Sequence, residues 1–95
     1  MKLLENIGFN AKEIAEMEDS IPSLIMEELN KEERLVLNNI NILKELDINN
    51  YLLIFKNYYE MFLMDSSVFK DVFEKYDHDD LIDKINKNIA IIEHL

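Results

Sequence analysis

Glycine and proline are almost absent from this chain, and their absence restricts its possible folds more than any other feature. The 95 residues include one glycine, Gly8, and one proline, Pro22, and there is no threonine. Sheet proteins use turn residues between strands and β-branched residues within them. The apolar residues here instead recur every three or four positions, which is the period of an amphipathic helix. The sequence therefore predicts an all-α fold without strands, roughly two-thirds helical or more.

The most apolar stretch of the chain runs from Tyr51 to Met64 and reads YLLIFKNYYEMFLM. Its main apolar face repeats at intervals of three, four and three residues: Leu52, Phe55, Tyr59 and Phe62. A helix that is apolar over most of its circumference must be covered on several sides. We therefore expect one continuous helix here, at the centre of the domain.

Short polar side chains predict where the other helices begin. The expected caps are Asn10 and Asn30, each with a glutamate three residues later, and Ser20, Asn49 and Asp65. The last helix is expected to run from about Asp79 to the end, after a polar break. These boundaries predict a compact bundle of about six to seven helices in a single domain, residues 1–95.

A short helical repeat is the alternative arrangement of the same helices. Shifting the sequence by 39 positions places Asn10 on Asn49, with apolar residues matched on both sides. This match divides the chain into two units, 3–41 and 42–95, each with a long helix, a turn, a second helix and a short apolar piece. Similarity of this quality also arises by chance in helix-rich chains, so the bundle and the repeat both remain open.

The residues of these units resemble those of a known family. The first unit contains Leu4-Glu5-Asn6-Ile7-Gly8-Phe9, then Glu13-Ile14, then Ile21-Pro22-Ser23-Leu24-Ile25. This series resembles the mitochondrial transcription termination factor repeat, in which Leu-Gly-Phe or Leu-Gly-Ile ends a leucine-rich helix and Glu-Ile and Pro-x-Leu-Leu follow. The second unit keeps Leu43-Lys44-Glu45-Leu46-Asp47-Ile48 but has Met61 at the proline position. The resemblance implies a curved solenoid that binds nucleic acid through basic side chains, and those basic positions are not matched here.

Charge restricts the partners of this chain. It has 20 acidic residues against 10 basic ones, a net charge of −10 at pH 7, and neither half is basic. Such a chain repels nucleic acid phosphates and anionic membrane surfaces. No apolar run reaches the ~18 residues that a membrane-spanning helix needs. We therefore expect a basic protein as partner, with no direct binding to nucleic acid or membranes, while the oligomeric state stays open.

Two acidic clusters are the candidate partner-binding sites, although solvated helix faces have the same composition. They are Glu27, Glu28, Glu32 and Glu33 at a turn between helices, and Asp77, Asp79, Asp80 and Asp83 at the start of the last helix. A calcium loop starting at Asp77 would need glycine and glutamate where Ile82 and Asn88 stand. We expect no metal and no cofactor. If charge does not govern binding, an apolar surface around Tyr58 and Met61 is the next candidate.

The aromatic residues of the central stretch have two interpretations. Tyr58, Tyr59 and Phe62 either form a contact surface or belong to the core.

The sequence contains no recognisable catalytic motif. Cysteine is absent, the four serines stand where helix caps explain them, and one glycine cannot make a phosphate-binding loop. We therefore expect a non-enzymatic protein. The absence of cysteine, and the early charged residues Lys2 and Glu5, which do not match a signal peptide, indicate the cytoplasm.

The leading functional hypothesis is a regulator or inhibitor of a basic, nucleic-acid-binding protein. Its carboxylates would stand where phosphates otherwise bind, as they do in antitoxins, immunity proteins and phage inhibitors. The alternatives are a nucleic-acid-binding module resembling transcription termination factors, and a structural or oligomerisation module.

Overall fold

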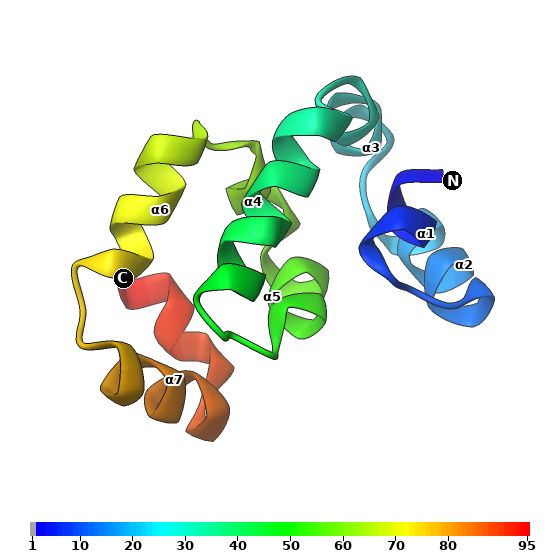
Figure 1. Ribbon diagram of the computed structural model, residues 1–95. Coiled ribbons are helices and arrows are strands. Elements are labelled where there is room, and N and C mark those ends of the chain that lie inside the picture. The colour runs from blue at the N-terminus through cyan, green and yellow to red at the C-terminus, as the bar shows by residue number, and fades with distance from the viewer. Residues whose placement is uncertain (1) are drawn as a thin grey trace.

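The computed structural model describes residues 2–95, and this part of the chain is all-α (Figure 1). Helices make up 81% of it, and no strand occurs between residues 2 and 95. The α-helices are α1 (Lys2–Ile7), α2 (Ala11–Ser20), α3 (Ser23–Lys31), α4 (Glu33–Glu45), α5 (Tyr51–Tyr58), α6 (Ser66–Glu74) and α7 (His78–Lys87). Two 3-10 helices are η1 (Tyr59–Leu63) and η2 (Ile89–His94). The predicted fold class is confirmed, and the number of helices is close to the six to seven expected.

Helix α4 occupies the middle of the fold. It packs against α1, α3, α5, α6 and η1, and Val36, Ile40 and Leu43 on its inner face are buried. In Figure 1, α1 and α2 lie on one side of α4, while α6 and α7 lie on the other. The expectation that the stretch 51–64 forms the central helix is therefore wrong. That position belongs to α4, because it is the helix that contacts both sides of the molecule.

The apolar stretch 51–64 is also not one continuous helix. Helix α5 ends at Tyr58, where the backbone leaves the helical region (φ −134°, ψ 43°), and η1 then continues as a tighter 3-10 helix. Phe55 and Phe62 remain fully buried on either side of this break. Because a 3-10 helix turns faster per residue than an α-helix, the side chains after Tyr58 point in directions that a continuous α-helix would not give them.

Two of the predicted helix caps are confirmed. The Asn10 side chain accepts a hydrogen bond of 2.8 Å from the Glu13 main-chain nitrogen, and the Glu13 side chain accepts one of 3.0 Å from the Asn10 main-chain nitrogen. Asp65 accepts a 3.0 Å hydrogen bond from the Ser67 main-chain nitrogen at the start of α6. These bonds satisfy donors that have no partner within the first turn of a helix.

Three predicted caps are wrong, since α3, α4 and α5 have no side-chain cap. Ser20 is the last residue of α2, and its hydroxyl donates back to the Met17 carbonyl oxygen at 3.5 Å. Asn30 lies inside α3, which continues to within one residue of α4. Asn50, rather than Asn49, is the residue that precedes α5.

The prediction of one uninterrupted last helix from Asp79 is wrong, because this region forms two helices, α7 and η2. Helix α7 begins at His78 with Asp77 as its cap, and extended backbone at Asn88 (φ −154°, ψ 105°) separates it from η2. Leu81, Ile85 and Ile92 are the residues of this region that are buried.

All five phenylalanines of the chain meet in one row through the core. The ring centroids of Phe9 and Phe55 lie 5.9 Å apart, and those of Phe55 and Phe62 lie 5.1 Å apart. The row continues to Phe69 at 5.2 Å and to Phe73 at 5.1 Å. Tilted and edge-on ring contacts at these distances are favourable beyond the area they bury. This phenylalanine row links the segment after α1 with α5, η1 and α6.

A fully buried polar residue, Asn39, joins α4 to the segment between η1 and α6. Its Nδ2 donates to the main-chain oxygens of Phe62 and Met64, both at 2.9 Å. Its Oδ1 accepts a 2.9 Å hydrogen bond from the hydroxyl of Ser66. A buried amide is tolerated when its hydrogen bonds are satisfied. Asn39 therefore fixes the end of η1 and the start of α6 against α4.

Candidate protein-binding surface

The first predicted acidic cluster lies where α3 passes into α4. Glu32 alone separates the two helices, with φ −103° and ψ 34°, so the chain changes direction there without a loop. Glu27, Glu28 and Glu32 are exposed, whereas Glu33 is half-buried. We call these four residues the acidic corner.

Three of the four carboxylates in the acidic corner have no side-chain partner among residues 2–95. The Nδ2 of Asn6 donates to Glu33 at 3.2 Å. Within residues 2–95, no ion pair or side-chain hydrogen bond holds Glu27, Glu28 or Glu32. Two basic residues also fall within positions 27–34, so four acids stand against two bases there. The corner therefore keeps a net negative charge that faces solvent.

The second predicted cluster begins at the cap of α7, and two of its four carboxylates, Asp80 and Asp83, are held in ion pairs. These ion pairs have i,i+4 spacing: Asp80–Lys84 at 3.0 Å and Asp83–Lys87 at 2.9 Å. The hydrogen bond and charge of Asp83 raise the pKa of Lys87. Asp77 accepts a 3.1 Å hydrogen bond from the Asp80 main-chain nitrogen as the helix cap. These acids mainly stabilise α7, whose N-terminus favours negative charge.

The structure does not bring the two clusters together. Helices α3 and α7 lie at opposite ends of the molecule in Figure 1. The i,i+4 spacing of the α7 pairs is visible in the sequence and could have indicated that they form.

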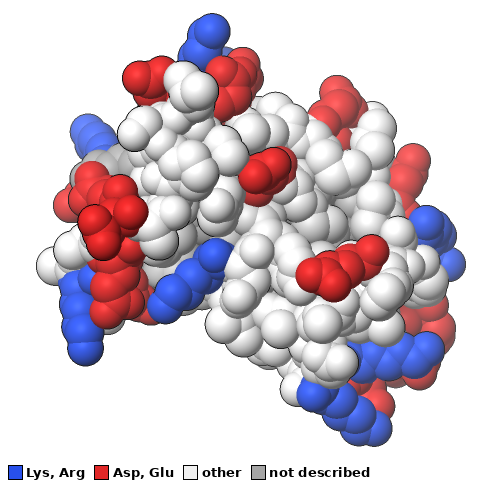
Figure 2. Space-filling model, turned by 180° about the vertical axis from the view of Figure 1, so that it is seen from behind, with Lys and Arg blue, Asp and Glu red and all other residues white. Residues whose placement is uncertain are grey.

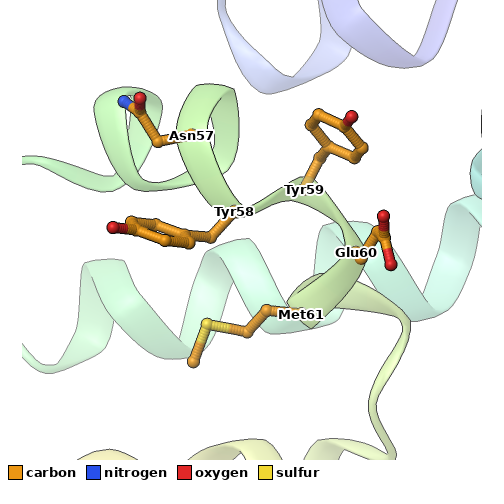
Figure 3. Close-up of a pocket in the computed structure, with 5 residues that line it drawn as sticks. All are labelled: Asn57, Tyr58, Tyr59, Glu60 and Met61. Atoms are coloured by element: carbon orange, nitrogen blue, oxygen red, sulfur yellow. The ribbon is translucent and has the colours of Figure 1, made fainter. Parts of the chain in front are cut away.

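An open pocket of about 240 Å³ lies at the break between α5 and η1, lined by residues 57–61 (Figure 3). Tyr58 and Met61 extend to the same side in this view, whereas Glu60 points the other way. Tyr58, Tyr59 and Met61 are half-buried, and Phe62 belongs to the core. The core interpretation is therefore confirmed for Phe62, whereas a contact surface around Tyr58 and Met61 stays a prediction.

Glu93 of η2 lies beside this pocket. The hydroxyl of Tyr58 donates to its Oε1 at 3.3 Å. Burial first, and then the charge and hydrogen bond of Glu93, raise the pKa of Tyr58. Sequence reasoning missed this contact, because the two residues are 35 positions apart and no local pattern connects them.

Uncharged surface and isolated acids share the face shown in Figure 2, which is the molecule seen from behind. A broad white area crosses its middle, single acidic side chains stand on it, and the basic side chains lie mostly at the margins. Helix η1 passes behind α4 in Figure 1 and so lies on this side of the molecule. Uncharged surface and single acidic side chains are therefore exposed on the same side of the molecule.

No family model, no curated protein and no solved structure matches this chain. The resemblance to the transcription termination factor repeat, and the division into two units, therefore stay predictions. In the described part of the chain, none of the helices combines the length and the apolarity needed to cross a bilayer. Residues 2–95 also contain no group of three or more side chains placed to hold a metal ion.

Proposed function

We propose that this protein is a non-enzymatic regulator that binds a basic protein through its acidic corner. The observation that supports this proposal most directly is the exposure of Glu27, Glu28 and Glu32 without side-chain partners in the part of the chain that the structure describes. Exposed carboxylates contribute little to folding, but they attract a cationic surface. The net charge of −10 extends this attraction beyond contact distance and speeds encounter.

The chemistry of the corner favours a partner that normally binds nucleic acid. Such proteins present arginine and lysine side chains to phosphates. The carboxylates of the acidic corner offer these side chains negative charge, as phosphates do. Occupying those side chains would inhibit the partner. A cytoplasmic setting belongs to this proposal, because a chain without cysteine suits a reducing compartment.

Affinity capture with the whole chain tests the proposal by comparing the wild type with the Glu27→Lys/Glu28→Lys variant. We expect the wild type to retain a basic protein at low salt, the variant to lose it, and rising ionic strength to release it. The matched control is Glu45→Lys/Asp71→Lys, which changes the net charge equally at exposed positions of α4 and α6. If the control abolishes capture as completely as the corner variant does, net charge alone governs binding and the corner is not the site.

Two further measurements separate the other functions. If DNA or RNA is retarded in a gel at low salt while no basic protein is captured, the nucleic-acid-binding module implied by the resemblance is favoured instead. If sedimentation shows a stable oligomer and no partner is found, a structural or oligomerisation module is favoured.

A further inference from the structure

The pocket between α5 and η1 has the size and the lining of a site for a protein side chain. Its volume of about 240 Å³ is below the ~300–1,000 Å³ of small-molecule sites. The half-buried Tyr58 and Met61 supply a rigid ring and a flexible thioether, which together adapt to aliphatic groups. The pocket therefore suits one apolar side chain better than a cofactor.

The surroundings of the pocket are acidic. Glu60 is one of its five lining residues, with its carboxylate on the opposite side from Tyr58 and Met61, and none of the five is basic. Glu93 approaches from η2 and accepts the hydrogen bond from Tyr58. An apolar floor beside carboxylates is complementary to an apolar side chain flanked by lysine or arginine. A cationic amphipathic helix presents that combination on one face.

Charge also argues against the other occupants. In a twofold dimer through this pocket, the patch that holds Glu60 and Glu93 would meet the same patch of the second copy, so carboxylates would lie close to carboxylates. Nucleic acid phosphates and anionic lipid surfaces would meet the same repulsion. We infer that this pocket is a docking site for an apolar side chain on a cationic amphipathic helix of a partner protein. The inference rests on the proposed function and adds to it a second contact of different chemistry.

A synthetic peptide serves as the probe. It has about 18 residues, or five helical turns, with leucines on one face and lysines on the other. The control peptide has the same composition with its leucines spread around the helix. Titrating each labelled peptide with the full chain and following fluorescence anisotropy gives the two dissociation constants. We expect the amphipathic peptide to bind at least tenfold more tightly than its control.

Substitutions in the pocket then locate the contact. We expect Met61→Ala to weaken binding of the amphipathic peptide by about tenfold and to leave the control peptide unaffected. Met26→Ala, at a half-buried methionine of α3, is the matched control and should change neither constant. If Met61→Ala lowers the helical circular dichroism signal, Met61→Gln replaces it, since glutamine keeps the length of the side chain and removes its apolar character.

Three results would overturn the inference. They are equal affinity for the two peptides, unchanged affinity in the Met61 variants, and self-association that these variants abolish. The corner variant Glu27→Lys/Glu28→Lys separates this inference from the proposed function. If it prevents partner capture while the Met61 variants have no effect on the peptide, the proposed function stands and the pocket inference fails. If the Met61 variants weaken binding of the amphipathic peptide while the corner variant still captures the partner, the pocket inference is supported and the proposed role of the acidic corner is wrong.

Discussion

The side-chain amide of Asn39 donates to the main-chain oxygen of Phe62 across 2.9 Å, although the two residues are 23 positions apart. The ring of Phe62 is fully buried at the same point. The side chain of this η1 residue therefore packs in the core, while its main-chain oxygen accepts a hydrogen bond from α4. A 3-10 helix leaves backbone groups less well satisfied than an α-helix does. The buried asparagine compensates for this where η1 ends.

We predict that Asn39→Ala lowers the free energy of unfolding by about 2–4 kcal/mol, because it leaves a buried carbonyl oxygen at Phe62, a partly buried one at Met64 and the Ser66 hydroxyl without their partner. Urea denaturation measures this loss. Asn38→Ala, at the exposed neighbouring position, is the control and should stay within about 0.5 kcal/mol of the wild type. Equal stability of the two variants would contradict the role assigned to Asn39.

Phe55→Ala and Phe62→Ala should each destabilise the protein by ~3–5 kcal/mol, because each empties the volume of a fully buried ring. Domains of this size have only ~5–15 kcal/mol of stability to lose. The double variant should lose less free energy of unfolding than the two single variants lose together, since the two rings are in contact. Thermal melting of the three variants measures these effects, with the exposed Tyr76→Ala as control. Unchanged melting temperatures in both single variants would show that the row does not stabilise the fold.

Acid should weaken the cap of α6. Hydrogen bonds from the side chain and then the main chain of Ser67 lower the pKa of Asp65 below its ordinary value of 3.8. The folded state therefore favours the carboxylate, and this contribution is complete above the ordinary pKa and is lost as the pH falls below about 4. Asp65→Asn keeps a capping oxygen but has no such titration.

The difference in urea midpoint between the wild type and Asp65→Asn should thus be present near neutral pH and shrink below about pH 4. Asp71→Asn, on the exposed side of α6, is the control for a carboxylate that caps nothing. A midpoint difference that is independent of pH would contradict this account.

Charge reversal at the two acidic clusters should have different effects. Glu27→Lys/Glu28→Lys should slow association with a basic partner on the order of tenfold at low salt and leave unfolding nearly unchanged. Asp79→Lys/Asp80→Lys should also slow association, but it additionally breaks the Asp80–Lys84 pair and places cations at the positive end of α7. Stopped-flow association at several salt concentrations, together with urea denaturation, separates the two effects. A complex that is insensitive to salt and to both reversals would exclude binding by charge.

Local chemistry made part of the fold predictable. The helical period predicted the fold class, and the cap at Asn10 with Glu13 was correctly placed because no other Asn, Asp or Ser stands between residues 7 and 18. At Asn49 and Asn50, two identical residues compete for one position, and the sequence does not distinguish them. The break at Tyr58 was invisible, because apolar spacing of three residues fits α and 3-10 helices alike.

The candidate site was predictable to a similar degree. The exposure of Glu27 and Glu28 was expected from their charge, and the structure places them on the surface. The pocket depends on the break at Tyr58, and the contact of Tyr58 with Glu93 joins distant positions, so both are properties of the folded chain. Asn39 was missed for the same reason, since it lies among other asparagines in α4 and only its distant partners show that it is buried.

The phenylalanine row also has a consequence for the order in which the protein folds. Phe55, Phe62, Phe69 and Phe73 follow one another at intervals of seven residues or fewer, whereas Phe9 reaches Phe55 from the far end of the chain. Short loops close at a lower entropic cost than long ones, so local contacts form early. We expect the rings of α5, η1 and α6 to assemble in the transition state, and φ-values from conservative substitutions to be high at Phe69 and low at Phe9. The N-terminal helices would then join a nucleus that has already formed.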